Sequence, residues 1–313
     1  MHIEIIDDLQ QFSRVKDNWA SVYEADPEAQ IFLSWTWLSK WLTRLDNQWF
    51  ILAARPHPGS LHYVAFFPLQ VRCVAGKDGR LYNEITMAGN KIADYTGLIC
   101  MPEFEDQAIP AFAAFIKSLH WAELNLEFVR ASDRRLALLL PHFPDADFEA
   151  VQVDEVNRID NINNCICPYI SLPDDWDEYL NNNVSSNSRQ KIRRFLRKVE
   201  ESDEFRITIA DRDTVKDDLE ILLQQWEIKW KPRKGELVNG IKNIVRIMLM
   251  HCFDNDLLFL PVLWRGDRPL GGFGHSDRHH KKIVVFCHRV ARRNGQQSPT
   301  RPRASRVQHS VCH

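Results

Sequence analysis

A run of basic side chains in residues 185–201 is the first feature of this sequence that could do chemistry. At about 100° per residue, its apolar positions form a stripe about one third of a helix circumference wide. The segment therefore predicts an amphipathic helix whose stripe packs on an apolar surface. Basic residues flank the stripe on both sides, and one flank, our candidate site for an anionic ligand, consists of Lys191, Arg194 and Lys198. The alternative is a solvated basic helix face.

A carboxylate stands next to a phenol at Asp94 and Tyr95, where a series of extended segments ends. A carboxylate in this position could orient an acceptor group or take its proton, so we predict this pair as catalytic. The alternative is a hydrogen-bonded pair with a structural role only.

Two indoles and an ammonium recur at helical spacing at Trp226, Lys229 and Trp230. Positions i, i+3 and i+4 share one helix face, which could stack on a sugar ring, so we predict these residues as substrate-binding. The alternative is a pair of tryptophans that face the core.

The cysteines and histidines do not predict a metal site. Cys165 and Cys167 are one residue apart, with no second pair placed to complete a set of ligands. The sequence predicts reduced, mostly buried thiols at the seven cysteines, which are Cys73, Cys100, Cys165, Cys167, Cys252, Cys287 and Cys312.

Length and charge limit the class of protein. A chain of 313 residues predicts two domains. Residues 1–277 carry 31 basic and 42 acidic side chains, which disfavours a general nucleic-acid binder. The N-terminus lacks the basic start of a secretory signal, and no apolar run reaches the roughly 18 to 20 residues that span a bilayer. We expect a cytoplasmic protein without a membrane span.

Both halves of the chain predict helices followed by an antiparallel series of strands. In the first half we expect strands near residues 2–6, 49–55, 61–71, 81–87, 95–100, 124–130 and 148–153, and helices near 8–24, 34–45, 103–119 and 133–140. Ser34 is the predicted cap of the helix at 34–45, which carries Trp37 and Trp41 at helical spacing. In the second half we expect strands near 168–172, 205–210, 257–264, 270–275 and 282–287, and helices near 174–180, 185–201, 214–230 and 240–253. The strands at 257–264 and 270–275 are expected to form a hairpin closed by residues 265–268.

Six motifs in this order resemble the FemAB-like branch of the GNAT superfamily of N-acetyltransferases. Within that branch, the sequence is similar to the CelD-like cellulose-biosynthesis proteins with a BioF2-like acetyltransferase domain. The resemblance covers about residues 30–287 and rests on residues 32–37 with Trp41, 66–69, 94–97, 188–194, Trp226 with Trp230, and 266–272.

The resemblance implies an α+β fold with two tandem GNAT-like domains, residues 1–160 and 161–287, each with a mixed, largely antiparallel sheet. It implies transfer of an acyl group from acetyl-coenzyme A, as co-substrate, to an amine or hydroxyl. The anionic ligand of Lys191, Arg194 and Lys198 would then be the phosphates of coenzyme A or a nucleotide-linked sugar. The acceptor would be a small molecule or a saccharide, in exopolysaccharide or cellulose biosynthesis. Two alternatives are a non-catalytic accessory protein of polysaccharide biosynthesis and a FemAB-type aminoacyl transferase, for which transfer RNA would supply the donor.

The C-terminal segment 288–313 departs from the family pattern. It contains six arginines and no acid or aromatic residue, and we predict it to be disordered. The nearest match to the superfamily's pyrophosphate-binding signature, residues 292–297, fails at its last position. We interpret the second domain as incomplete, with a frameshift or truncation as the hypothesis and a natural basic tail as the alternative.

Overall fold

The computed structural model describes residues 1–45, 48–76, 79–89, 93–143, 148–151, 156–157, 162–163, 173–276 and 284–287. The chain divides into two compact units, whose main parts are Met1–Cys167 and Pro168–Asp277. The predicted strand at 168–172, the signature at 292–297 and the tail at 288–313 lie outside the described residues. Of the predicted strand at 148–153, residues 148–151 are described and form no strand.

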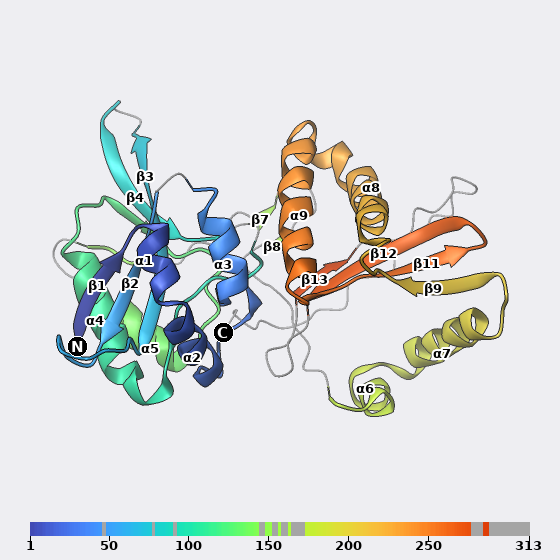
Figure 1. Ribbon diagram of the computed structural model, residues 1–313, viewed down its shortest axis with the longest axis horizontal. Coiled ribbons are helices and arrows are strands. Elements are labelled where there is room, and N and C mark those ends of the chain that lie inside the picture. Colours follow the sequence, from blue (N-terminus) through green and yellow to red (C-terminus); the bar gives the residue numbers. More distant parts are fainter. Residues whose placement is uncertain are drawn as a thin grey trace. The chain divides into compact units, whose positions relative to one another are not determined.

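The first unit is a six-stranded mixed sheet with helices on both faces (Figure 1). Its strands run in the order β1-β2-β3-β4-β6, β5 pairs with β3, and β4–β6 is the parallel pair. The strands are β1 (His2–Ile6), β2 (Trp49–Arg55), β3 (Ala65–Ala75), β4 (Leu81–Met87), β5 (Ile99–Cys100) and β6 (Glu123–Asn125). The helices are α1 (Leu9–Arg14), α2 (Lys16–Ala25), α3 (Trp35–Leu42), α4 (Glu105–Lys117) and α5 (Asp133–Leu139).

Alternation along β2 sends side chains to two different cores. Phe50 and Leu52 belong to the core that includes α4, whereas Trp49 faces α1, where Phe12 lies 6.1 Å from it, centroid to centroid. Because both faces are covered, β2 is buried along almost its whole length.

Two differences from the predicted elements have local causes. The predicted helix at 8–24 is two helices, because Val15 (φ −96°, ψ 10°) interrupts it. The predicted strand at 124–130 ends at Asn125, and Phe128 has φ 58°, which no strand residue adopts. Helix α3 begins one residue after its predicted cap, Ser34, whose hydroxyl accepts from the N–H of Trp37 at 3.2 Å.

The second unit has an antiparallel sheet in the order β10-β12-β11-β9, with β13 paired to β12. Its strands are β9 (Phe205–Ile209), β10 (Leu258–Phe259), β11 (Pro261–Arg265), β12 (Arg268–Ser276) and β13 (Val284–Cys287). Its helices are α6 (Trp176–Asn183), α7 (Ser186–Glu200), α8 (Val215–Lys234) and α9 (Leu237–Asp254). The two short strands β7 (Val156–Asn157) and β8 (Ile162–Asn163) pair with each other. The fold is thus α+β with mixed, largely antiparallel sheets, as predicted.

Helices α8 and α9 pack against this sheet through an apolar cluster. A side chain on Gly272 of β12 would begin 3.7 Å from Cβ of Leu222 of α8, which is an ordinary van der Waals distance, so α8 packs directly over this strand. Lys242 of α9 bridges to Glu227 of α8 at 3.1 Å, and a hydrogen bond from Lys242 lowers the pKa of that carboxyl. Within the described residues, no helix is both long and apolar enough to cross a bilayer.

Chemical labelling of the cysteines tests whether the cores of the two units are packed as described. Cys100 and Cys252 are buried and Cys73 is exposed, and burial raises the pKa of each buried thiol to about 12. Because the thiolate is the reactive form, we expect iodoacetamide at about pH 8 to label Cys73 in the folded protein and to spare the other two until urea is added. Peptide mass mapping measures this. Labelling of all three at one rate would contradict the packing.

Candidate functional site

The basic helix α7 forms where it was predicted. Its cap is Ser185, whose hydroxyl accepts from the N–H of Ser188 at 3.4 Å. On one flank, Arg193 pairs with Asp177 of α6 at 2.7 Å and Arg189 donates to Asn181, so this flank is held against α6.

The other flank of α7 carries the three predicted cofactor-binding residues, and all three are exposed. Lys191 and Arg194 form no ion pair with the described residues, while the ammonium of Lys198 lies 5.6 Å from the ring of Phe205. Unpaired, exposed cations suit the phosphates of a coenzyme.

The apolar stripe of α7 is only partly covered in the described structure. Ile192, Leu196 and Val199 are half-buried, but Phe195 is 56% exposed. The described contacts of α7 are with α6 and β9, and they cover only part of the stripe. The apolar surface that we expected to cover the whole stripe is therefore not complete among the described residues.

The three predicted substrate-binding residues share one face of α8, as their spacing requires. Trp226 and Trp230 are half-buried and Lys229 is exposed. The buried face of α8 is formed by other residues, among them Leu219 and Leu222, so the tryptophans lie beside the core rather than in it.

Cations of its own helix surround Trp230. The ammonium of Lys229 lies 5.0 Å from the ring centroid and that of Lys234 lies 5.3 Å from it, with the guanidinium carbon of Arg233 at 5.7 Å. A sugar stacked on this indole would compete with these contacts.

The predicted catalytic pair lies in the first unit, at a turn that follows β4. The N–H of Ala93 donates to the carbonyl of Gly89 at 3.0 Å, which places Asp94 and Tyr95 directly after this turn. Asp94 is exposed and Tyr95 is half-buried. Desolvation raises the pKa of the Asp94 carboxyl above its ordinary value, although the solvent that reaches this exposed residue limits the shift.

Arg130 is a further residue of this site that the sequence did not reveal. Its guanidinium carbon lies 5.4 Å from the ring centroid of Tyr95. Two backbone bonds hold it there: Thr96 donates to the carbonyl of Phe128 at 2.8 Å, and the N–H of Arg130 donates to the carbonyl of Thr96 at 3.0 Å. No local spacing relates residues 95 and 130, so only tertiary structure could bring them together.

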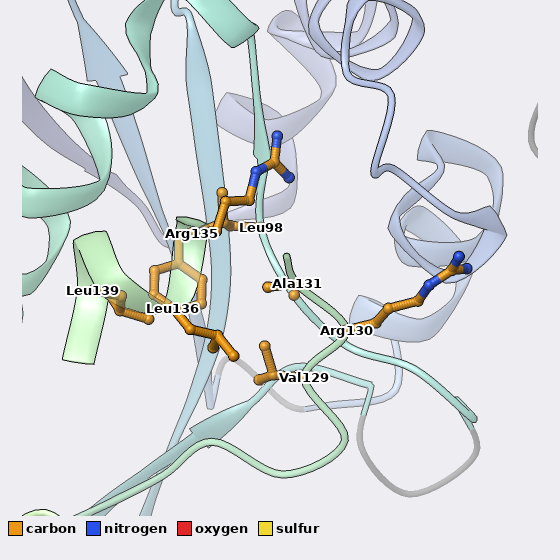
Figure 2. Close-up of a pocket in the computed structure, with 9 residues that line it drawn as sticks. Leu98, Val129, Arg130, Ala131, Arg135, Leu136 and Leu139 are labelled. Carbon is orange, nitrogen blue, oxygen red and sulfur yellow. The ribbon is translucent and has the colours of Figure 1, made fainter. Parts of the chain in front are cut away.

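A pocket beside Arg130 is too small to hold a substrate. Its volume is about 10 Å³, which is room for about one water molecule. Figure 2 shows apolar side chains gathered around it, among them Val129 and Leu136, with the guanidinium of Arg130 directed away. Among the described residues no cluster of three or more histidine, cysteine or acidic side chains is placed to hold a metal.

Part of the chain matches a known protein family. Residues 186–299 match the family model described as an acetyltransferase (GNAT) domain. This span begins with α7 and includes α8, α9 and the strands β9 to β13. Among curated proteins, none matches the chain at a significant level.

Similarity to solved structures is at most 12% in sequence identity among the two described below, so it bears on the fold and not on function. A conserved protein of unknown function from Bacteroides thetaiotaomicron VPI-5482 aligns with a TM-score of 0.53 and 12% identity, over 92% of this chain and 80% of that protein. The aminoglycoside antibiotic 6'-N-acetyltransferase AAC(6')-Ih from Acinetobacter baumannii aligns with a TM-score of 0.29 and 10% identity, over 49% of this chain and 98% of that one. The second likeness is too low to carry weight.

Proposed function

We propose that this chain is an acyltransferase that moves an acetyl or other acyl group from acyl-coenzyme A to an amine or hydroxyl. The match of residues 186–299 to an acetyltransferase (GNAT) domain is the observation that supports it. We take residues 1–160 and 161–287 as two tandem domains of this type, acting in the cytoplasm without a metal.

The chemistry needs few protein groups. The acceptor's nitrogen or oxygen attacks the thioester carbonyl, the carbon–sulfur bond breaks, and the thiolate is reprotonated from solvent. A base must take the proton that the acceptor loses. We assign that role to Asp94, with Tyr95 orienting the acceptor, and a saccharide of exopolysaccharide or cellulose biosynthesis as the acceptor.

The donor's phosphates are assigned to one flank of α7. Lys191, Arg194 and Lys198 are exposed, and Lys191 and Arg194 have no ion pair among the described residues, so binding a phosphate breaks no internal contact of theirs. The indoles of Trp226 and Trp230, with Lys229, are assigned to the acceptor.

Calorimetry with acetyl-coenzyme A tests the proposal directly. We expect saturable binding and, with an amine or hydroxyl acceptor, release of a free thiol. A folded chain that gives neither heat nor thiol would contradict the proposal and favour the non-catalytic alternative.

Charge reversal on α7 tests which cations hold the donor. We expect the double variant Lys191→Glu and Arg194→Glu to weaken acetyl-coenzyme A binding about tenfold or more for each cation, because hydrogen bonds to charged groups are the stronger kind. The double variant Arg189→Glu and Arg197→Glu, a charge change of the same size on the opposite flank, is the matched control and should leave affinity nearly unchanged. Equal losses from both would show general electrostatic attraction instead of a site.

A further inference from the structure

A cluster of cations surrounds Trp230 near the C-terminal end of α8, where the chain turns into α9 (Figure 1). Residues 229–234 contain four basic side chains and no acid. The charged groups of Lys229, Arg233 and Lys234 lie 5.0, 5.7 and 5.3 Å from the centroid of the Trp230 ring. Like charges this close together repel one another, so three of them around one ring call for an explanation.

Neighbouring cations of α8 and α9 have acidic partners. Lys231 of α8 and Lys242 of α9 both pair with Glu227, at 3.5 and 3.1 Å. Lys229 and Lys234 are exposed, and neither forms an ion pair with the described residues. The positive charge beside Trp230 is therefore left without an acid in the part of the chain that the structure describes.

The dipole of α8 accounts for only part of this cluster. Cations are favoured in the last turn of a helix, where the dipole is negative. Arg233 and Lys234 lie in that turn, but Lys229 precedes it. The indole of Trp226, four residues before Trp230, shares this face, and both indoles are half-buried. The face thus combines two aromatic rings with three cations.

We propose that the acceptor bound by this face of α8 is an anionic saccharide, one that carries carboxylate or phosphate groups. A neutral sugar stacked on Trp230 would displace cations from the ring and offer them only hydroxyl groups. An anionic sugar offers each displaced cation a charge-assisted hydrogen bond in exchange, while its ring takes the place of the cations on the indole. Such a ligand fits an acidic exopolysaccharide or its precursor and not a cellulose chain, which is uncharged.

This ligand is the acceptor of the proposed acyl transfer, so the assignment rests on the proposed function. Its binding can nevertheless be measured without acyl-coenzyme A. Binding of an anionic saccharide without any acyl transfer would leave the anionic site standing and count against the proposed function. Acyl transfer to uncharged acceptors, with no binding of anionic ones, would do the reverse.

Calorimetry on the full chain with pairs of ligands that differ in charge tests the proposal. Trigalacturonate is compared with cellotriose, an uncharged trisaccharide, and glucose 1-phosphate is compared with glucose. We expect at least one anionic ligand to bind about tenfold or more tightly than its uncharged counterpart, the effect of one charged hydrogen bond. The pair that differs identifies the anionic group as carboxylate or phosphate. If neither anionic ligand binds more tightly than its counterpart, the proposal is overturned.

Single substitutions test whether the cations around Trp230 hold the anion. Lys229→Gln and Lys234→Gln should each weaken its binding about fivefold or more, because each removes one charged donor. Lys231→Gln is the matched control, since it removes the same charge between these two positions from a side chain that pairs with Glu227 instead. It should leave the affinity nearly unchanged. Equal losses from all three variants would show general attraction instead of a site and overturn the proposal.

Thermal unfolding of the same variants separates binding from a structural role. Lys229→Gln should not lower the melting temperature, because the lost contact with the indole is offset by relief of repulsion among the three cations. A lower melting temperature with unchanged affinity for the anion would show that the cluster serves only the helix, and would also overturn the proposal.

Discussion

Replacing Arg135 with methionine is expected to lower the free energy of unfolding by about 3–5 kcal/mol, the cost of removing one partner from a buried charge network. Arg135 is 2% exposed and Asp26 is fully buried. Arg135 donates to both carboxylate oxygens of Asp26, at 3.1 and 2.8 Å, and to Glu105 at 2.8 Å. Burial lowers the pKa of Arg135, but the hydrogen bonds and charge of Asp26, the hydrogen bond to Glu105 and the charge of Glu28 raise it overall.

The loss is large because Asp26 has no route to solvent once Arg135 is gone. Two backbone N–H groups that also donate to it, those of Cys100 at 2.9 Å and Glu28 at 2.7 Å, do not neutralise its charge. Methionine fills similar space, so a cavity contributes little.

Arg134 is the matched control, because it is the adjacent residue on the same helix and also pairs with Glu105, at 3.3 Å. Its side chain is 59% exposed, and exposed pairs contribute about 0 to 1 kcal/mol. Urea unfolding followed by tryptophan fluorescence measures both variants. Equal losses from Arg134→Met and Arg135→Met would show that burial does not set the energy of this network.

Replacing Asp94 with asparagine is expected to reduce acyl transfer by about 10²- to 10⁴-fold in kcat/KM, the usual contribution of a general base. Asparagine keeps the shape and loses the basic oxygen. Binding of acetyl-coenzyme A should be unchanged, because we assign the donor to α7. Thiol release measures the first quantity and calorimetry the second. Asp133→Asn, a substitution in the first turn of α5, is the control and should retain activity.

The free energy of unfolding provides a second test of the role of Asp94, independent of activity. Desolvation raises the pKa of Asp94 in the folded chain, so the folded state binds its proton more tightly than the unfolded state does. This group therefore makes the free energy of unfolding fall as pH rises from the ordinary carboxyl pKa through the raised one. At neutral pH, Asp94→Asn should not destabilise the protein. A variant that loses activity together with stability would point to a structural role.

The pH profile of the wild type should follow from the same shift. A base acts only when it is deprotonated, so activity should fall as pH drops through the pKa of Asp94. Because that pKa is raised, the acid limb should lie above the ordinary aspartate range. In Asp94→Asn, the residual activity should lack this limb.

Local patterns in the sequence determined much of the fold. The amphipathic spacing predicted α7 within one residue at each end, and Ser34 was predicted as the cap of α3. The hairpin of β11 and β12 was also predicted, with Gly266 in its turn at φ 54°. These features depend on backbone hydrogen bonds and on side chains only a few residues apart, which is why one sequence reveals them.

Partners distant in the chain were decided only by the tertiary structure. Arg134 and Arg135 are indistinguishable in sequence, yet only Arg135 reaches Asp26, 109 positions away. The spacing of Trp37 and Trp41 predicted a packed helix face, but whether their N–H groups find acceptors depends on strands and turns folded from elsewhere in the chain. The three-dimensional surroundings of a side chain set its burial and its hydrogen bonds. The sequence could therefore predict candidate residues, but only the fold determined which of them have partners.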